Sequence, residues 1–447
     1  MLDRLFLLSS KGTTPGREVI AGCTTFAAMA YILIVNSAIL ADAGMPRDAL
    51  VTATALGAAI ATLLMAFLAN LPLAMAPGMG INAFFAYAVC IGMGVPWQSA
   101  LALVFINGII FLLLSLSGVR EKIVNALPGS LKAAICAGIG LFIAFIGLKN
   151  GGMIVAHPAT FVALGDLTQP PVALFAVGIL LTCILVARGT PAAVLASIVI
   201  LALVGFVVPD GKGGSITHLP GSVVSLPASI EPLFLKLDFG FVLKEPLKAL
   251  PVILALLLVD MFDNLGTLIG VTKRAGLMDE SGRIPGLSRA LVADSLAAIL
   301  SSLLGTSTVV SYVESATGVQ AGGRTGLTAV VVAILFLLAL FFTPLILAIP
   351  SVAVAPALVV VGILMFSSVA EIDLSRFEIA APAVLTIAAM PMAFSISTGI
   401  GIGVIAMVAI SLGTGKNREH LTPFTCGLAA IFLLHFMEPL IFRLMEK

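Results

Sequence analysis

Residues 306–323 read TSTVVSYVESATGVQAGG and lie between two strongly apolar segments. The stretch carries many hydroxyl groups and the carboxylate of Glu314, and it ends in glycines, unlike a lipid-facing helix. Its first half is rich in Thr, Val and Tyr, which favour strands, and residues from Val313 onward could form a short helix. Irregular backbone at membrane depth is tolerated only where protein or a water-filled cavity satisfies its amides. We therefore expect the stretch to border a cavity; the alternative is a polar re-entrant loop with a packing role.

The composition is that of a membrane protein. Of the 447 residues, 60% are hydrophobic and 10% are charged, which is far more apolar than a soluble domain. We expect a multi-pass protein of the cell (inner or plasma) membrane, in contact with lipid. The net charge of +1 gives no electrostatic case for binding nucleic acid. The five cysteines are odd in number and scattered, which indicates neither a disulfide framework nor a metal cluster, and we expect no cofactor.

Apolar segments of about 20 residues, the length that crosses a bilayer, form two sets of seven. The predicted spans are 19–41, 50–69, 72–93, 98–117, 131–149, 171–187 and 191–208, then 248–271, 286–304, 306–323, 326–348, 352–369, 378–395 and 397–413. We expect an all-α polytopic protein with a cytoplasmic N-terminus (1–18), a first repeat (19–208), an extracytoplasmic loop (209–247), a second repeat (248–413) and a cytoplasmic loop with a C-terminal apolar helix (414–447). An odd number of spans per half inverts one half relative to the other, as in many secondary transporters.

The loop charges indicate which end faces the cytoplasm. With the N-terminus inside, the inner connections hold most of the Lys and Arg residues, whereas the short outer loops contribute mainly Arg47. This bias predicts a cytoplasmic N-terminus. The last apolar segment, 424–443, could be a fifteenth span, but His435 and Glu438 interrupt it, so we favour a helix that lies on the membrane or on the bundle.

The third span of the first half is interrupted as well. Pro77 and Gly80 stop a helix from running through this span, and Asn82 stands where a new helix could begin, because Asn is a favourable N-cap. The polar stretch around Glu314 occupies the third span of the second half. A pair of broken segments at corresponding positions points to a transporter binding site, with the N-termini of half-helices near the midplane.

Four acids lie inside predicted spans: Asp260, Asp263, Asp294 and Glu314. The spans hold no deep Lys or Arg to neutralise them. Buried carboxylates without cationic partners tend to take up protons or to bind a cation. We interpret Asp260, Glu314 and Asp294 as candidates for proton coupling; the alternative for each is a structural hydrogen bond to a neighbouring helix.

Aromatic and hydroxyl side chains accompany these acids. The three tyrosines fall in the first, third and tenth spans as Tyr31, Tyr87 and Tyr312, and Phe84 and Phe262 stand beside polar positions. Such rings, with amide and carboxylate groups at the edge, would suit a planar heterocycle, although each Phe taken singly is more often ordinary packing. Thr25, in the first span, could reach the same cavity or bond back to its own helix.

Four segments together resemble a known family: residues 25–36, 77–87, 260–267 and 311–319. They are similar to the AzgA-type purine permeases of the second nucleobase-cation symporter family, which includes the uracil and xanthine permeases. The resemblance covers roughly residues 10–415 in order. It implies fourteen spans in two inverted sevens, divided into a core domain (spans one to four and eight to eleven) and a gate domain. It also implies a short strand followed by a helix in the third and tenth spans, with the substrate between them.

The resemblance further implies roles for single residues. Asp260 and Glu314 would hold the ring N–H groups of a base, and backbone amides near Ala83 and Phe84 would hold its other edge. Phe84 or Phe262 would lie against the ring. An acid matching Asp294 would support the site or the proton path. One departure is Asn264, where many relatives have Thr, and this leaves the fine shape of the site open.

These observations predict a secondary transporter that imports a purine nucleobase (adenine, guanine or hypoxanthine) with a proton, by movement of the core against the gate. The residue pattern does not distinguish the three bases, and a homodimer through the gate domain is an expectation from the resemblance alone. One alternative is an anion carrier of the same fold, for which a central basic residue would be expected. An intramembrane aspartyl protease built on Asp260 and Asp294 would need a Gly-x-Gly-Asp signature, which is missing. A passive channel fits broken helices with central carboxylates less well. We expect no enzyme activity.

Overall fold

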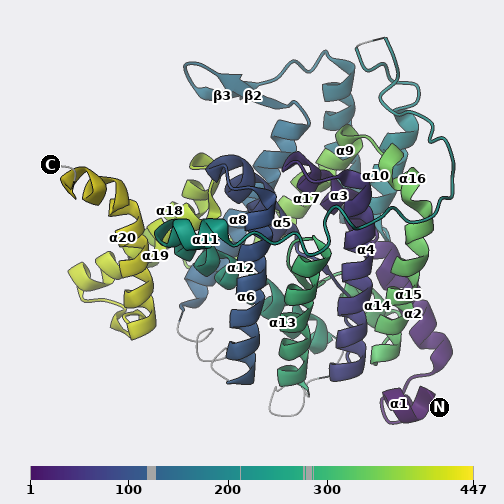
Figure 1. Cartoon of the computed structure of the whole chain (residues 1–447), viewed down its shortest axis with the longest axis horizontal. Helices are drawn as coiled ribbons and strands as arrows, with labels where there is room; N and C mark the ends of the chain where they lie inside the picture. Colours follow the sequence, from purple (N-terminus) through teal and green to yellow (C-terminus); the bar gives the residue numbers. More distant parts are fainter. Residues whose placement is uncertain are drawn as a thin grey trace.

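The computed structural model describes residues 2–117, 127–211, 213–274, 277, 284 and 286–445. Helices dominate it, and many lie side by side across the molecule (Figure 1). In this described part, nine helical stretches are long and apolar enough to cross a membrane. They are Pro15–Asp42 (α2 and α3), Arg47–Ala69 (α4 and a π-helical end), Trp97–Leu116 (α6), Gly129–Asn150 (α8), Pro170–Ala187 (α9), Leu287–Leu304 (α13), Gly326–Ala348 (α15 and α16), Ser351–Glu371 (α17 and a 3-10 turn) and Ile396–Thr414 (α19).

Further helices lie at other predicted spans. They are α10 (Ala193–Val204), α12 (Pro246–Arg274) and α18 (Phe377–Met392). A multi-pass helical membrane protein is therefore confirmed, while the count of fourteen spans and the inverted repeat stay predictions. The last helix, α20 (Pro423–Met445), packs against α19 and α12.

Local sequence explains where several helices begin and end. Pro15 occupies the first turn of α2, where a missing N–H costs nothing, and the Thr14 side chain accepts a hydrogen bond from the Arg17 N–H. Gly286 and Gly305 flank α13 with φ of 83° and 87°, a left-handed conformation that favours glycine. A Cβ at Gly305 would also lie 2.4 Å from the Leu233 Cβ, so the loop before α11 (Gly240–Lys244) can pass directly over this helix end.

Short strands break the two segments that the sequence singled out. Strand β1 (Met75–Pro77) pairs antiparallel with β4 (Val309–Ser311), with Ala76 opposite Val310. Strand β1 leads into α5 (Met79–Ala83) and a π-helical continuation to Gly92, and β4 leads into α14 (Ser315–Gln320). The predicted strand followed by a helix is therefore confirmed in both segments.

The helix after β1 begins earlier than the sequence suggested. Gly78 is its N-cap, and Asn82 lies one turn inside, where its N–H donates to the Gly78 carbonyl at 2.8 Å. The prediction of Asn82 as the first residue of this helix is therefore wrong. Gly78 takes the position because its extended backbone (φ −69°, ψ 126°) leads directly from the strand into the helix.

The helices form two groups that pack mainly within themselves. In the first, α15 packs on α2 and α4, α13 packs on α6 and α4, and both strands lie inside this group. In the second, α17 packs on α8 and α9, and α18 packs on α19 and α8. In the second group, α8 and α17 approach each other closely at glycines, which leave room between the two backbones. A Cβ at Gly140 would lie only 2.5 Å from the Gly362 carbonyl oxygen. We refer to the first group as the core and to the second as the gate; that they are separate moving domains stays a prediction.

Two connections add features outside the helices. The loop before α11 crosses helix ends of the first group, where the N–H groups of Ser225, Leu235 and Asp238 donate to carbonyls of Phe341, Leu303 and Gln98, respectively. After α8, an antiparallel hairpin of β2 (Ile154–His157) and β3 (Phe161–Leu164) projects from one end of the molecule (Figure 1). The sequence analysis did not predict this hairpin.

Candidate functional site

A cavity of about 90 Å³ lies where the two broken segments meet α12 and α17. It is lined by Tyr31, Gly78, Met79, Gly80, Thr267, Val310, Ser311, Tyr312, Val313, Glu314, Val361 and Met365. We call it the central cavity. Among the described residues of this lining, the polar side chains come from the first span, from α12 and from the second broken segment, and α17 of the second group supplies Val361 and Met365.

Backbone bonds fix the two broken segments to each other. Beyond the paired strands, the Gly78 N–H donates to the Thr308 carbonyl at 3.0 Å, and the Tyr312 N–H donates to the Ala74 carbonyl at 2.9 Å. The Tyr312 hydroxyl donates to the Pro77 carbonyl at 2.6 Å. Because Pro77 is a strand residue, Tyr312 secures one broken segment against the other while it lines the cavity.

Glu314 is the acidic residue of the central cavity. It is the N-cap residue of α14 and is half-buried. The Tyr31 hydroxyl donates to Glu314 Oε1 at 2.6 Å, a short distance typical of a charge-assisted bond to a carboxylate. Tyr31 stands between α2 and α3, at the interruption of the first span. The sequence analysis noted this tyrosine but did not assign it to the site, because the two residues are 283 positions apart.

Polar residues beside the strands are buried and bonded to one another. The Ser307 hydroxyl donates to Asn82 Oδ1. Asn36 Nδ2 donates to the Thr54 hydroxyl at 2.6 Å and to the Thr306 hydroxyl at 3.1 Å. Asn82 therefore braces the two broken segments, and its side chain is not part of the cavity lining.

Asp260 and Glu314, which were predicted to bind the base together, do not both line the central cavity: Glu314 lines it and Asp260 does not. Asp260 is 1% exposed, lies on α12 and accepts a hydrogen bond of 3.3 Å from Asn107 of α6. Among the described side chains of α12, Thr267, two turns further along, lines the cavity. Asp294 is buried on α13 and also lies outside the lining. In the described part of the chain, no three metal-ligating side chains lie together.

Other predicted site residues lie around the cavity instead of in its lining. Ala83 and Phe84 are buried, and the Phe84 N–H donates to carbonyls of its own helix. Thr25 is buried on α2 against α14, where a Cβ at Gly318 would lie 2.1 Å from the Thr25 hydroxyl oxygen. The side chain of Phe262 lies outside the described residues.

A further buried acid, Glu18, joins α2 to α15. Its carboxylate accepts the N–H groups of Arg324 (2.9 Å) and Thr328 (3.1 Å) and the Thr328 hydroxyl (2.6 Å). Acceptors at a helix start satisfy N–H groups that have no partner within the helix. Glu18 therefore has a structural role at the start of α15.

Membrane helices that enclose a polar cavity between two broken segments define a membrane transport protein. The chain matches the family described as "Permease family" over residues 16–433 and belongs to it. This membership confirms a transport protein rather than an enzyme and leaves the protease alternative without support.

Relatives along the whole chain carry the same description. The chain is 46% identical to a putative permease of Methanocaldococcus jannaschii, over 98% of each chain. It is 44% identical to the adenine permease AdeP of Escherichia coli K12, over 97% of this chain and 95% of that protein. It is also 44% identical to the guanine/hypoxanthine permease PbuG of Bacillus subtilis 168, over 98% and 99%. The resemblance to purine permeases that the sequence motifs indicated is confirmed.

Solved structures share the fold at low identity. The transmembrane domain of the cyanobacterial bicarbonate transporter BicA superposes with a TM-score of 0.63 at 16% identity, covering 85% of this chain and 96% of that domain. The murine anion transporter Slc26a9 in its inward-facing state gives 0.64 at 12% identity, covering 89% and 68%. These likenesses show the fold alone.

Proposed function

We propose that this permease imports a purine nucleobase together with a proton. Relatives named as adenine and as guanine/hypoxanthine permeases, more than 40% identical along the whole chain, support this substrate class. The observation that carries the proposal is Glu314, which faces a cavity between two half-helices and is held there by Tyr31. A carboxylate suits the N–H groups of a neutral base, because both of its oxygens accept hydrogen bonds.

The opposite edge of the base would meet the start of the helix after β1. Gly78, Met79 and Gly80 line the cavity, and the first N–H groups of a helix have no partner within that helix. The N–H groups of Met79 and Gly80 replace those of Ala83 and Phe84 as our candidates, because the Phe84 N–H is bonded inside the helix and the Gly78 N–H is bonded to Thr308. Tyr312 and Met79 offer surfaces for the ring.

Proton coupling would use the acids of the core. Glu314 would bind the base, and Asp260 and Asp294 are buried on α12 and α13, which follow one another along the chain. Each of these three carboxylates must be neutral or hydrogen-bonded during part of the transport cycle, because an ionised carboxylate without a partner costs much free energy inside a membrane protein. Asn107 supports Asp260 with its amide group. We infer that the core moves against the gate, with an N-terminus in the cytoplasm.

Uptake by permease-deficient cells tests this function. Cells expressing the chain should accumulate one or more of radiolabelled adenine, guanine and hypoxanthine, and a protonophore should abolish accumulation. Glu314→Gln keeps the size of the side chain but loses an acceptor oxygen, and it should lower uptake at least tenfold. Glu371→Gln alters an exposed acid at the end of the 3-10 turn that follows α17 and serves as the matched control. Accumulation that survives the protonophore would refute proton coupling, and no uptake of any base despite membrane expression would refute the substrate class.

A further inference from the structure

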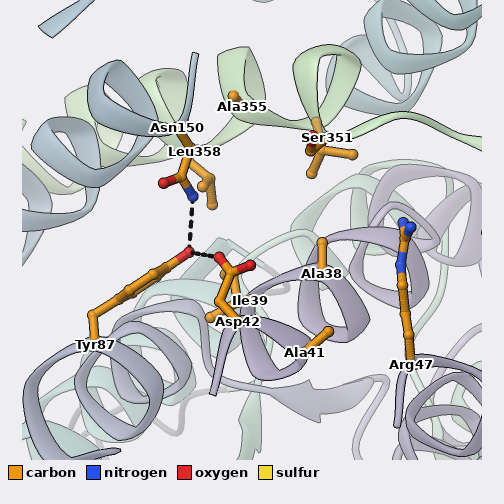
Figure 2. A pocket seen from close by; sticks show the side chains of 11 residues that line it. Ala38, Ile39, Ala41, Asp42, Arg47, Tyr87, Asn150, Ser351, Ala355 and Leu358 are labelled. Atoms are coloured by element: carbon orange, nitrogen blue, oxygen red, sulfur yellow. Dashed lines mark hydrogen bonds between the residues drawn. The ribbon is translucent and has the colours of Figure 1, made fainter. Parts of the chain in front are cut away.

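A second and larger cavity, of about 320 Å³, lies between the core and the gate. Figure 2 shows its lining, which consists of Ala38, Ile39, Ala41, Asp42, Arg47, Tyr87, Asn150, Ser351, Val354, Ala355 and Leu358. We call it the outer cavity. Its volume falls at the lower end of the range for small-molecule sites, about 300–1,000 Å³.

The outer cavity continues the central cavity along the same three membrane segments. Each segment lines both cavities, and the lining residues are seven positions apart in each: Tyr31 and Ala38 in the first span, Gly80 and Tyr87 after β1, and Val361 and Val354 on α17. Seven residues are two helical turns, or about 10 Å. The two cavities therefore follow one another along the same three segments, at the boundary of core and gate.

Polar groups meet at one edge of the outer cavity (Figure 2). The Tyr87 hydroxyl donates to Asp42 Oδ2 at 2.6 Å and accepts from Asn150 Nδ2 at 2.9 Å. Among the described residues, the second Asp42 oxygen and the Asn150 amide oxygen form no hydrogen bond. Two hydrogen-bond acceptors, one oxygen of Asp42 and one of Asn150, therefore remain for a ligand beside the Tyr87 hydroxyl.

Arg47 supplies donors at the other side of the cavity. Its Nη2 donates to the Ile349 carbonyl at 3.2 Å, while its buried Nε has no hydrogen-bond partner among the described residues. The Ser351 hydroxyl lines the cavity near it. A guanidinium carries five N–H donors, so Arg47 keeps donors for a ligand in the cavity although its Nε is covered by protein atoms.

The walls between these edges are apolar and come from two helices. Ala38 and Ala41 belong to α3, and Ala355 and Leu358 belong to α17 on the opposite side. Two apolar walls with donors and acceptors at the edges fit a flat heterocycle that carries N–H groups on one side and ring nitrogens or a carbonyl on another. An anion would meet Asp42, and an aliphatic solute would leave the polar edge unused.

We propose that the outer cavity is a second binding site for the transported purine nucleobase, occupied on the path to or from the central cavity. The proposal rests on the proposed function, since it takes the same substrate class. Asp42 and Asn150 hold the N–H groups of the base, Arg47 and Ser351 hold its acceptors, and the alanine-rich walls enclose the ring. Among the described residues the two cavities share no lining residue, so a base in one does not occupy the place of a base in the other.

Binding stoichiometry tests the proposal. The purified chain in lipid nanodiscs is titrated with radiolabelled adenine, guanine and hypoxanthine in turn, and the wild type should bind two molecules per chain. Glu314→Ala should abolish binding in the central cavity and leave one molecule per chain. Ala38 is a half-buried residue of the wall of the outer cavity, and Ala38→Phe should fill this cavity and leave only the molecule in the central cavity. Asn150→Ala should raise the Kd of the second molecule about tenfold or more, as expected for the loss of one well-placed hydrogen bond. Ala187→Phe, an exposed position at the end of α9, is the control and should keep both.

The outcomes separate the two proposals. One molecule per chain, lost in Glu314→Ala and unaffected by Ala38→Phe, would overturn the outer site and leave the proposed function intact. Two molecules that both persist in Ala38→Phe and in Asn150→Ala would place the second base elsewhere and overturn the site as well. No binding of any of the three purines would overturn the proposed function and, with it, this site.

Discussion

Replacing Gly318 with alanine should weaken binding of the base in the central cavity, although Gly318 does not line this cavity. Gly318 lies on α14, where that short helix packs directly against α2. A Cβ at this position would lie 2.5 Å from the Ala21 carbonyl oxygen and 2.1 Å from the Thr25 hydroxyl oxygen, whereas real Cβ contacts begin at 3.0 Å. The Ala21 oxygen is backbone and cannot rotate away, so α14 must retreat by about half an ångström to one ångström.

This retreat would act on Glu314, which immediately precedes α14 and whose bond to Tyr31 is 2.6 Å long. A carboxylate displaced by this distance loses alignment with both the tyrosine and the base. Hydrogen bonds to charged groups contribute about 1.5–3 kcal/mol, which corresponds to a Kd raised by roughly tenfold to a hundredfold. We expect this loss in the Gly318→Ala variant.

Titration of purified variants with the transported base measures the effect. Gly427→Ala is the matched control, because no atom lies within 4 Å of a Cβ there, and it should bind as the wild type does. Adding Thr25→Ala to Gly318→Ala removes one of the two clashes and should recover only part of the affinity. Wild-type affinity in the single variant would refute the reasoning, because it would show that α14 accepts a side chain without moving Glu314.

Three further predictions concern other contacts. Tyr31→Phe removes the donor to Glu314 and should raise the Kd of the base about tenfold, at unchanged Tm, in the same titration. Glu18→Ala leaves buried N–H groups at the start of α15 without an acceptor, at about 1–3 kcal/mol each, and should lower Tm by several degrees, whereas Glu18→Gln should retain most of the stability. The Gly240 N–H and the Ser99 hydroxyl lower the pKa of Asp238 below 3.8. Asp238→Asn should therefore lower Tm near pH 7, and the difference from the wild type should shrink as the pH falls through this lowered pKa; a difference that does not change with pH would contradict the assignment.

The broken segments could be predicted because their residues are unusual for a membrane helix. Pro77 and Gly80 exclude a continuous helix, and the hydroxyl-rich stretch before Glu314 needs polar surroundings. These signals are local, so they predicted both interruptions and the acid that lines the cavity. The start of the helix at Met79 was missed because Gly78 caps it through its backbone, without a side-chain bond.

The partners of these residues depend on contacts across the chain. Tyr31 and Asn107 stand in apolar runs, and nothing near them in sequence indicates that they bond to Glu314 and Asp260. The separation of Asp260 from the cavity lining depends on how α12 is rotated and placed, which hydrophobic periodicity does not determine for a helix buried on several sides. The outer cavity is likewise a product of how α3 packs against α17.

The two cavities differ in the kind of contact that the gate makes with the core, and this difference bears on the proposed movement. At the central cavity, the described lining residues from the gate are the apolar Val361 and Met365, so the proposed sliding of α17 past the core would exchange no hydrogen bond of these two side chains. At the outer cavity, Asn150 of α8 bonds to Tyr87 of the core. The proposed motion of the gate against the core would break or stretch that bond, which contributes about 0.5–1.5 kcal/mol. The Asn150 side chain that would accept from a base through its oxygen is therefore the same side chain that joins gate and core through its NH₂ group, so a bound base and the proposed movement would act on one residue.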